Sequence, residues 1–153
     1  MTRIIIDGDA CPVTHSVIEL TTGTGIFVIV VRSFSHYSTT IQPEHVRTVY
    51  VDNNPEAVDY KIVQLSNSED IVITQDYGLA SLLLNKVAMV LHHSGRIYTN
   101  DNIDTLLAQR HANAQFRKSG GRTKGPSKFT ADDQSQFETI LTQILNDYID
   151  EEQ

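Results

Sequence analysis

The strongest constraint on the fold is a set of short apolar runs, the first of which is Ile4-Ile5-Ile6. This run is β-branched at every position, and Ile26–Val31 (IFVIVV) is apolar throughout. Runs without polar alternation are typical of parallel strands that are covered on both faces. Val46–Val51 alternates, which predicts a third strand near an edge of the sheet. Asp70–Thr74 and Val87–His92 are predicted as the fourth and fifth strands.

Helical patterns separate these strands. We predict helices over Pro12–Thr22, Pro55–Ser66 and Tyr77–Lys86, because each places apolar residues at helical spacing and two begin with proline. The segment Ser33–Glu44 is rich in Ser, Thr and His and is predicted to be a loop. Alternation of strands and helices indicates an α/β fold with a mostly parallel sheet flanked by helices on both faces.

The remainder of the chain is predicted to be helical, apart from a short piece at Arg96–Tyr98. One helix is expected over Asp101–His111 and another over Asp132–Ile149, where Thr130 and Asp133 have the spacing of a capping box. Residues 1–153 are predicted to form one domain. Residues 1–99 would be its α/β core, and 100–153 its C-terminal helices with a basic, glycine-rich loop at 113–129.

Composition restricts the cellular compartments in which we expect the protein. No apolar run approaches the ~18 residues that span a bilayer, and the N-terminus lacks the pattern of a secretory signal. Cys11 is the single cysteine, which excludes an intrachain disulfide and a cysteine-rich zinc site. We therefore expect a cytoplasmic protein with no membrane partner; the sequence leaves a homo-oligomer open.

Charge is distributed unevenly. The formal charge is −7, yet no acidic residue lies between Thr105 and Ala131, and half of the twelve Lys and Arg residues fall there. This segment lacks the Gly-Lys-Ser/Thr ending of a phosphate-binding P-loop. We predict an arm that contacts a polyanion, with a mobile solvated loop as the alternative. The predicted nucleic-acid-binding residues are Arg117, Lys118, Arg122, Lys124 and Lys128.

Carboxylates follow the predicted strands. Asp7 and Asp9 come directly after the first strand, Asp76 follows the fourth, and Glu56 and Asp59 lie three residues apart at the start of a helix. Because the carboxyl ends of parallel strands meet at one rim, these side chains are predicted to share a site. Close carboxylates repel one another and lose hydration, and oxygen ligands favour Mg²⁺ or Mn²⁺. The sequence therefore predicts a divalent metal site.

Structural roles compete with this interpretation. Asp9 and Asp76 each have the position of a helix N-cap, and Glu56 is favourable at any helix N-terminus. Cys11 could act as a nucleophile, but its acidic neighbours would raise the thiol pKa, which favours a small buried residue. The six histidines lack metal-ligand spacing and are expected to be structural.

Four segments, DGDACP, PEAVDYKIV, DIVITQDYGLA and GRIYTNDNIDTLLAQRH with GGRTKGP, occur in the order found in one family. Across essentially the whole chain the sequence resembles the YaiI/YqxD family of uncharacterised bacterial proteins, which is grouped with PIN-like domains. The resemblance implies a three-layer αβα fold and a Mg²⁺- or Mn²⁺-dependent nuclease. It implies Asp7, Asp59 or Glu56, and Asp76 as metal ligands and catalytic residues. Asp9 would be an additional ligand, and the family's later fourth Asp has no clear counterpart.

Three functions remain open at this point. The first is a metal-dependent phosphodiesterase acting on RNA or another phosphodiester. The second is a phosphatase similar to haloacid dehalogenases, with Asp7 as nucleophile, Asp9 as acid and Thr74 as a further site residue. The third is a PIN-like fold without turnover that binds RNA or a partner protein.

Overall fold

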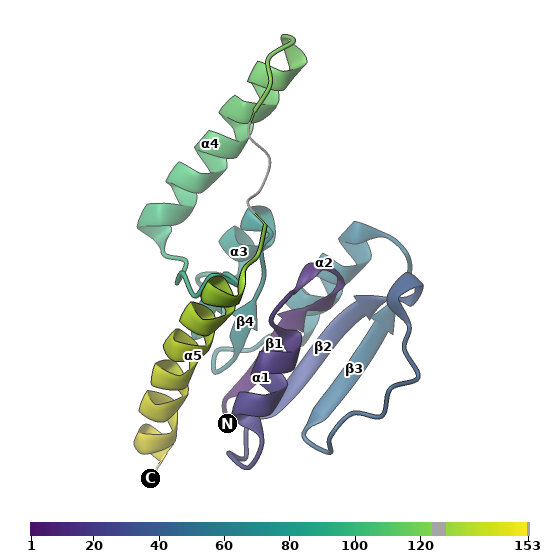
Figure 1. Cartoon of the computed structure of the whole chain (residues 1–153), viewed down its shortest axis with the longest axis vertical. Coiled ribbons are helices and arrows are strands. Elements are labelled where there is room, and N and C mark those ends of the chain that lie inside the picture. Colours follow the sequence, from purple (N-terminus) through teal and green to yellow (C-terminus); the bar gives the residue numbers. More distant parts are fainter. Residues whose placement is uncertain (124–127, 153) are drawn as a thin grey trace.

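The computed structural model describes residues 1–123 and 128–152 and contains a five-stranded, fully parallel sheet (Figure 1). The order of the strands is β3-β2-β1-β4-β5, so β1 lies at the centre and β3 at an edge, as predicted. The strands are β1 Arg3–Asp7, β2 Phe27–Ser33, β3 Val46–Val51, β4 Ile71–Ile73 and β5 Met89–Leu91.

Helices cover both faces of the sheet, which confirms the predicted α/β layers. Successive isoleucines of β1 point to opposite faces: Ile4 and Ile6 pack in one core cluster and Ile5 in the other, and all three are fully buried. On the Ile4 and Ile6 face lie α1 Thr14–Thr21 and α5 Ala131–Glu152. On the Ile5 face lie α2 Pro55–Leu65, α3 Tyr77–Leu83 and the first turns of α4 Asn100–Lys118.

The predicted end of α4 was wrong. This helix was predicted to end at His111, but it continues to Lys118, and residues 113–118 of the predicted loop are helical. Between His111 and Gly120 the chain contains no Gly or Pro, and Ala, Gln, Arg and Lys favour helix. Only Ile103 of α4 is buried, so most of this helix projects from the body (Figure 1).

Helix α5 belongs to the core although it lies outside residues 1–99. Phe137 and Leu141 are fully buried, and Phe137 is the largest of the fully buried side chains. The predicted capping box is present: Thr130 N–H donates to Asp133 Oδ2 at 2.9 Å, and Asp133 N–H donates to Thr130 Oγ1 at 3.1 Å. In the described parts of the chain, no helix is both long and apolar enough to cross a bilayer.

The strand order places a crevice at one rim of the sheet. From β1 the chain crosses to β2 on one side, and β4 pairs with β1 on the other side. Such a reversal leaves an opening at the carboxyl ends of the two strands, where α/β proteins bind ligands. Asp7 ends β1, and Thr74-Gln75-Asp76 follows β4, so the crevice lies between two of the predicted site segments.

Candidate functional site

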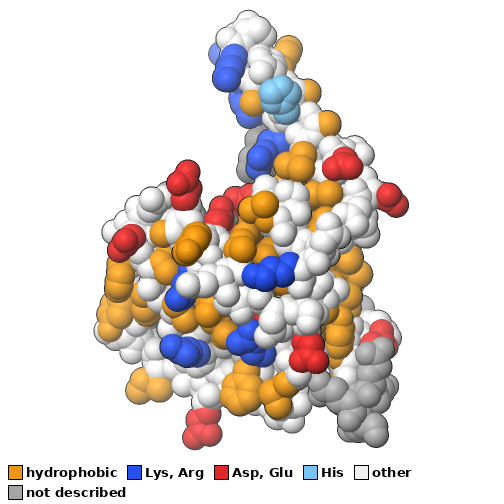
Figure 2. Space-filling model, turned by 180° about the vertical axis from the view of Figure 1, so that it is seen from behind, with side chains coloured by type: hydrophobic (Ala, Val, Ile, Leu, Met, Phe, Trp, Pro, Cys, Tyr) orange, Lys and Arg blue, Asp and Glu red, His pale blue; other side chains and the backbone are white. Residues whose placement is uncertain are grey.

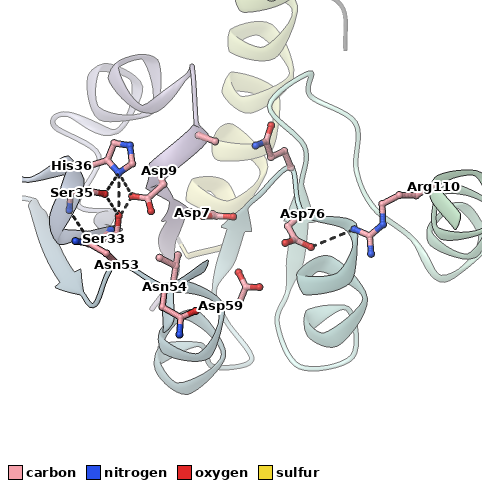
Figure 3. Close-up of a pocket in the computed structure, with 13 residues that line it drawn as sticks. Asp7, Asp9, Ser33, Ser35, His36, Asn53, Asn54, Asp59, Asp76 and Arg110 are labelled. Carbon is pink, nitrogen blue, oxygen red and sulfur yellow. Dashed lines mark hydrogen bonds and ion pairs between the residues drawn. The ribbon is translucent and has the colours of Figure 1, made fainter. Parts of the chain in front are cut away.

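A cavity of about 510 Å³ opens at this rim and gathers side chains from several elements. Four of the five predicted acidic ligands line it: Asp7, Asp9, Asp59 and Asp76 (Figure 3). The fifth, Glu56, is not among the lining residues. Its side chain lies on the exposed first turn of α2, where the Asn54 side chain caps the helix. The structure therefore brings four of the predicted carboxylates together and leaves Glu56 outside the cavity. Their role as metal ligands stays a prediction.

Gly8 explains how the two N-terminal carboxylates come to lie at one cavity. It begins a short 3₁₀ turn, Gly8–Ala10, that passes directly over β2. A Cβ at position 8 would lie 2.7 Å from Val30 Cγ1 and 2.9 Å from the Val31 carbonyl oxygen, closer than real contacts allow. The absence of a side chain lets the turn approach β2 and brings Asp9 towards the end of that strand.

Thr74 connects Asp7 to Asp76. Its hydroxyl donates to Asp7 Oδ2 at 2.8 Å and accepts from the Asp76 N–H at 3.0 Å. The Thr74 carbonyl accepts from the buried hydroxyl of Tyr98 at 3.2 Å. Because Thr74 is itself buried, this chain of hydrogen bonds fixes the position of one site carboxylate relative to the other.

Asp76 confirms its predicted structural role and also faces the cavity. It is the N-cap of α3, and its Oδ1 accepts from the Leu79 N–H at 3.0 Å. The same Oδ1 lies 4.0 Å from Nη1 of Arg110, which reaches across from α4 (Figure 3). Among the lining residues that the structure describes, Arg110 is the only Lys or Arg. The cavity is therefore acidic, with one cation at its border.

Asp9 was predicted as a possible helix N-cap, but its side chain has other partners in the structure. The N-cap of α1 is Val13, so Asp9 does not cap this helix. Its Oδ1 instead accepts from the Ser33 N–H at 2.9 Å and lies 3.1 Å from His36 Nδ1 (Figure 3). Asp9 thus connects the turn after β1 to the end of β2, and these contacts form part of one wall of the cavity.

Four carboxylates line the cavity, and Arg110 is the one Lys or Arg among its described lining residues. Burial, followed by the charges of Asp76, Asp7 and Glu56, raises the pKa of Asp59 to about 6. Burial also raises the pKa of Asp7, against the opposing effect of the Thr74 hydrogen bond, and the charges of Asp76 and Asp9 add to the rise. The site consequently favours either protons or a cation.

The donor set suits Mg²⁺ or Mn²⁺ chemically. All candidate ligands are carboxylate oxygens, whereas Cys11, whose thiol pKa burial raises, lies outside this cavity. Among the described residues, however, no group of three or more His, Cys, Asp and Glu side chains is close enough to hold a metal ion. Mg²⁺ commonly binds through one or two carboxylates and completes its shell with water and phosphate oxygens. The arrangement fits such a partial site and not a closed protein cage.

The predicted nucleic-acid-binding residues lie on a separate part of the molecule. Arg117 and Lys118 occupy the last turn of α4, and Arg122 and Lys128 are exposed beyond it. Lys124 lies outside the described residues. Arg117 follows Arg110 by seven residues, which corresponds to about 10 Å along a helix. Figure 2 shows Lys and Arg side chains along the projecting arm and Asp and Glu side chains where it meets the body.

Two contributors to the site were not predicted from the sequence. Arg110 was counted only within the basic segment, because its approach to Asp76 depends on the direction in which α4 leaves the body. The Ser33 and His36 contacts with Asp9 join residues that are distant in sequence. Thr74 did carry a local signal, since a hydroxyl two residues before Asp76 is the spacing of a side-chain turn.

Comparison with known proteins gives relatives over nearly the whole chain. The chain is 68% identical to the UPF0178 protein of Staphylococcus saprophyticus, covering 97% of this chain and 96% of that one. It is 64% identical to the UPF0178 protein of Staphylococcus haemolyticus, covering 95% and 98%. No solved structure matches. Residues 5–147 match the profile of the uncharacterised YaiI/YqxD family, and the chain belongs to this family.

Proposed function

We propose that the protein is a divalent-metal-dependent phosphodiesterase that acts on RNA or a similar polyanion, in the manner of PIN-like nucleases. One observation carries this proposal. Asp7, Asp59 and Asp76 come from three different elements and line one cavity at the switch point of the sheet, where burial and then the charge of Asp76 raise the pKa of both Asp7 and Asp59. A protein that gained nothing from this cluster would be expected to replace or pair these partly buried charges.

In this proposal one or two of the carboxylates of Asp7, Asp59 and Asp76 would hold each Mg²⁺ or Mn²⁺ ion, and water and phosphate oxygens would complete its shell. When bound, the cation supplies positive charge to the phosphodiester and lowers the pKa of water. Thr74 keeps Asp7 and Asp76 in register, and Asp9 supports the wall formed by Ser33 and His36. The raised pKa values mean that the cation competes with protons for the same oxygens.

Arg110 is suited to contact the substrate phosphate. Its guanidinium lies at the border of the cavity, 4.0 Å from Asp76 and more than half exposed, so it can reach a phosphate oxygen without losing a tight ion pair. Guanidinium groups bind phosphate through paired N–H donors. Further along α4, Arg117 and Lys118, with Arg122 and Lys128 beyond, would follow the backbone of a longer substrate.

The binding module without turnover has one observation in its favour. In the described chain, no three candidate ligands close around a single ion, so the fold could bind RNA without cleaving it. In contrast, the phosphatase alternative gains no support from Thr74. Its hydroxyl is buried and committed to Asp7 and Asp76, which leaves it no free position for a phosphoryl group.

Cleavage of single-stranded RNA by the purified protein with Mg²⁺, Mn²⁺ or EDTA tests the proposal. We expect cleavage with either metal, none with EDTA, and loss of at least ~100-fold in rate for Asp7→Asn and Asp76→Asn. Glu56→Gln is the matched control, because it removes a carboxylate near Asp59 that lies outside the cavity. Equal binding of RNA by wild type and Asp7→Asn, without cleavage under any metal, would favour the binding module.

A further inference from the structure

We propose that Phe34, Tyr37 and Tyr50, here called the aromatic platform, stack against the bases of a single-stranded nucleic acid. The proposal deepens the proposed function, because the strand's phosphate would occupy the neighbouring acidic cavity. Stacking on aromatic side chains contributes about 1–3 kcal/mol per base and works with every base. It also requires an unpaired strand, since a duplex keeps its base faces covered.

The three rings are assembled into one surface. Phe34 stacks on Tyr50 with ring centroids 5.9 Å apart and planes 17° apart, and Tyr37 lies 5.0 Å from Tyr50 at a tilt of 46°. Phe34 is 55% exposed and Tyr37 is 63% exposed, and neither belongs to the two core clusters. Large rings that are held together and left in water indicate a contact surface and not a packing role.

The platform adjoins the cavity through a single turn. Phe34–His36 forms a 3₁₀ turn in which Ser35 and His36 line the cavity while Phe34 contacts Tyr50. Ser35 N–H donates to Asn53 Oδ1 at 2.6 Å, which fixes the turn to the chain that follows β3. Figure 3 shows Ser35, His36 and Asn53 at the border of the cavity opposite Arg110. A strand crossing the cavity away from Arg110 therefore arrives at the platform.

Charge explains why rings are needed on this side. Asp9 faces the turn, and the described lining of the cavity contains no Lys or Arg here to hold a phosphate. Arg32 on β2 pairs in register with Tyr50, and its buried Nε has no hydrogen-bond partner among the described residues. Stacking binds the neutral base, so it can hold the strand on this side of the cavity without a phosphate contact beside the carboxylates.

A tryptophan probe tests the platform directly, because the chain contains no Trp. Phe34→Trp in an Asp7→Asn background places one fluorophore on the platform and prevents turnover under the proposed function. We expect an eight-nucleotide oligouridine to quench its emission, whereas an abasic strand with the same number of phosphates does not. In the same background, Phe34→Ala should weaken oligouridine binding by roughly 5- to 100-fold. Tyr60→Trp is the matched control, since Tyr60 is 72% exposed on α2 and lines no described cavity.

Three results would overturn the platform: equal quenching by the abasic strand, equal affinity for Phe34→Ala, or an emission change that depends only on protein concentration. The last result would assign these rings to contact between copies of the chain. The platform and the proposed function fail separately. RNA cleavage by the wild type without quenching of Phe34→Trp removes only the platform. Quenching without any metal-dependent cleavage removes only the phosphodiesterase.

Discussion

Carboxylates at the two ends of the central sheet have opposite kinds of partners. At the amino end, Asp70 is fully buried and receives two hydrogen bonds from Arg3, at 3.0 Å to Oδ1 and 2.8 Å to Oδ2. The Asn67 N–H adds a third at 2.9 Å. At the carboxyl end, Asp7 receives one hydrogen bond, from the neutral hydroxyl of Thr74, and faces other carboxylates.

Under the proposed function, this difference separates a structural charge, Asp70, from a functional one, Asp7. Arg3 supplies Asp70 with a complete partner, so nothing from outside the chain is needed there. Burial raises the pKa of Asp7 and of Asp59, and the charges of neighbouring carboxylates add to the rise. Neither has an arginine partner of this kind among the described residues. Both carboxylates adjoin apolar strands, but the fully buried Asp70 has an arginine partner, whereas the partly buried Asp7 accepts its hydrogen bond from a neutral hydroxyl. The supply of positive charge therefore distinguishes the two ends.

The largest expected effect comes from breaking the structural pair. Asp70→Asn removes the charge that Arg3 binds and should lower the free energy of unfolding by about 3 kcal/mol. Asp7→Asn should leave it unchanged or raise it in metal-free protein, because the substitution removes a repulsive charge. Urea unfolding in EDTA measures both. Equal destabilisation by the two substitutions would show that the carboxyl end is as structural as the amino end.

The second largest expected effect is the stabilisation of the protein by added Mn²⁺. Mn²⁺ at a hundred times its dissociation constant should stabilise the wild type by about 2.7 kcal/mol. Asp7→Asn and Asp76→Asn should lose this gain, and Glu56→Gln should keep it. Thermal unfolding with and without Mn²⁺ is the measurement. A gain that survives in Asp7→Asn would place the ion elsewhere on the molecule.

The third effect removes the hydroxyl between the carboxylates. Thr74→Val has the same shape but leaves Asp7 Oδ2 and the Asp76 N–H without this partner, which should cost about 2 kcal/mol. Thr74→Ser keeps the hydroxyl and should recover most of the loss. Mn²⁺ affinity should fall about tenfold in Thr74→Val. Unchanged metal affinity in this variant would limit Thr74 to a structural role.

The smallest effect is the pH dependence of Asp59. Its pKa rises from 3.8 to about 6 on folding, so its contribution to stability is present below pH 3.8 and is lost as the pH rises through 6. Asp59→Asn avoids this loss, so in EDTA its stability relative to wild type should increase between pH 4 and 7. We expect less than about 1 kcal/mol, because Asp59 is partly exposed and solvent screens it.

Comparing the two proteins at each pH cancels other titrating groups. Burial, with the charges of His93 and Arg96, lowers the pKa of His92 to about 4, which acts in the opposite direction over the same range. His92 is present in both proteins, so its contribution drops out of the difference. A difference that stays constant from pH 4 to 7 would contradict the raised pKa of Asp59.

The sheet could be predicted because its strands carry their own signal. Ile4-Ile5-Ile6 and IFVIVV have no polar positions to place in water, and the prolines and glycines between strands mark turns. The end of α4 could not be predicted in the same way. Its last two turns have almost no buried side chains, so neither hydrophobic periodicity nor a stop residue before Gly120 marks where it ends.

For the site, the sequence identified the carboxylates but not their surroundings. Asp7 and Asp76 follow strands that are adjacent in any sheet of this topology, so their meeting follows from strand order. Glu56 was misplaced because spacing of three gives only approximate direction on a helix: Asp59 reaches the cavity and Glu56 remains outside. The positions of Arg110 and His36 at the cavity depend on the direction of α4 and on the path of the chain after β2. No local sequence pattern specifies either.

The projection of α4 gives the cavity a mechanical property. The helix is fixed to the body at its base, where Ile103 is buried, and its far turns lie in solvent (Figure 1). Arg110 lies between these two parts. A tilt of α4 about its buried first turns would therefore move the Arg110 guanidinium towards the cavity carboxylates or away from them. A ligand that binds only the far end of α4 would thereby change the distance between the Arg110 guanidinium and the cavity carboxylates without contacting the cavity itself.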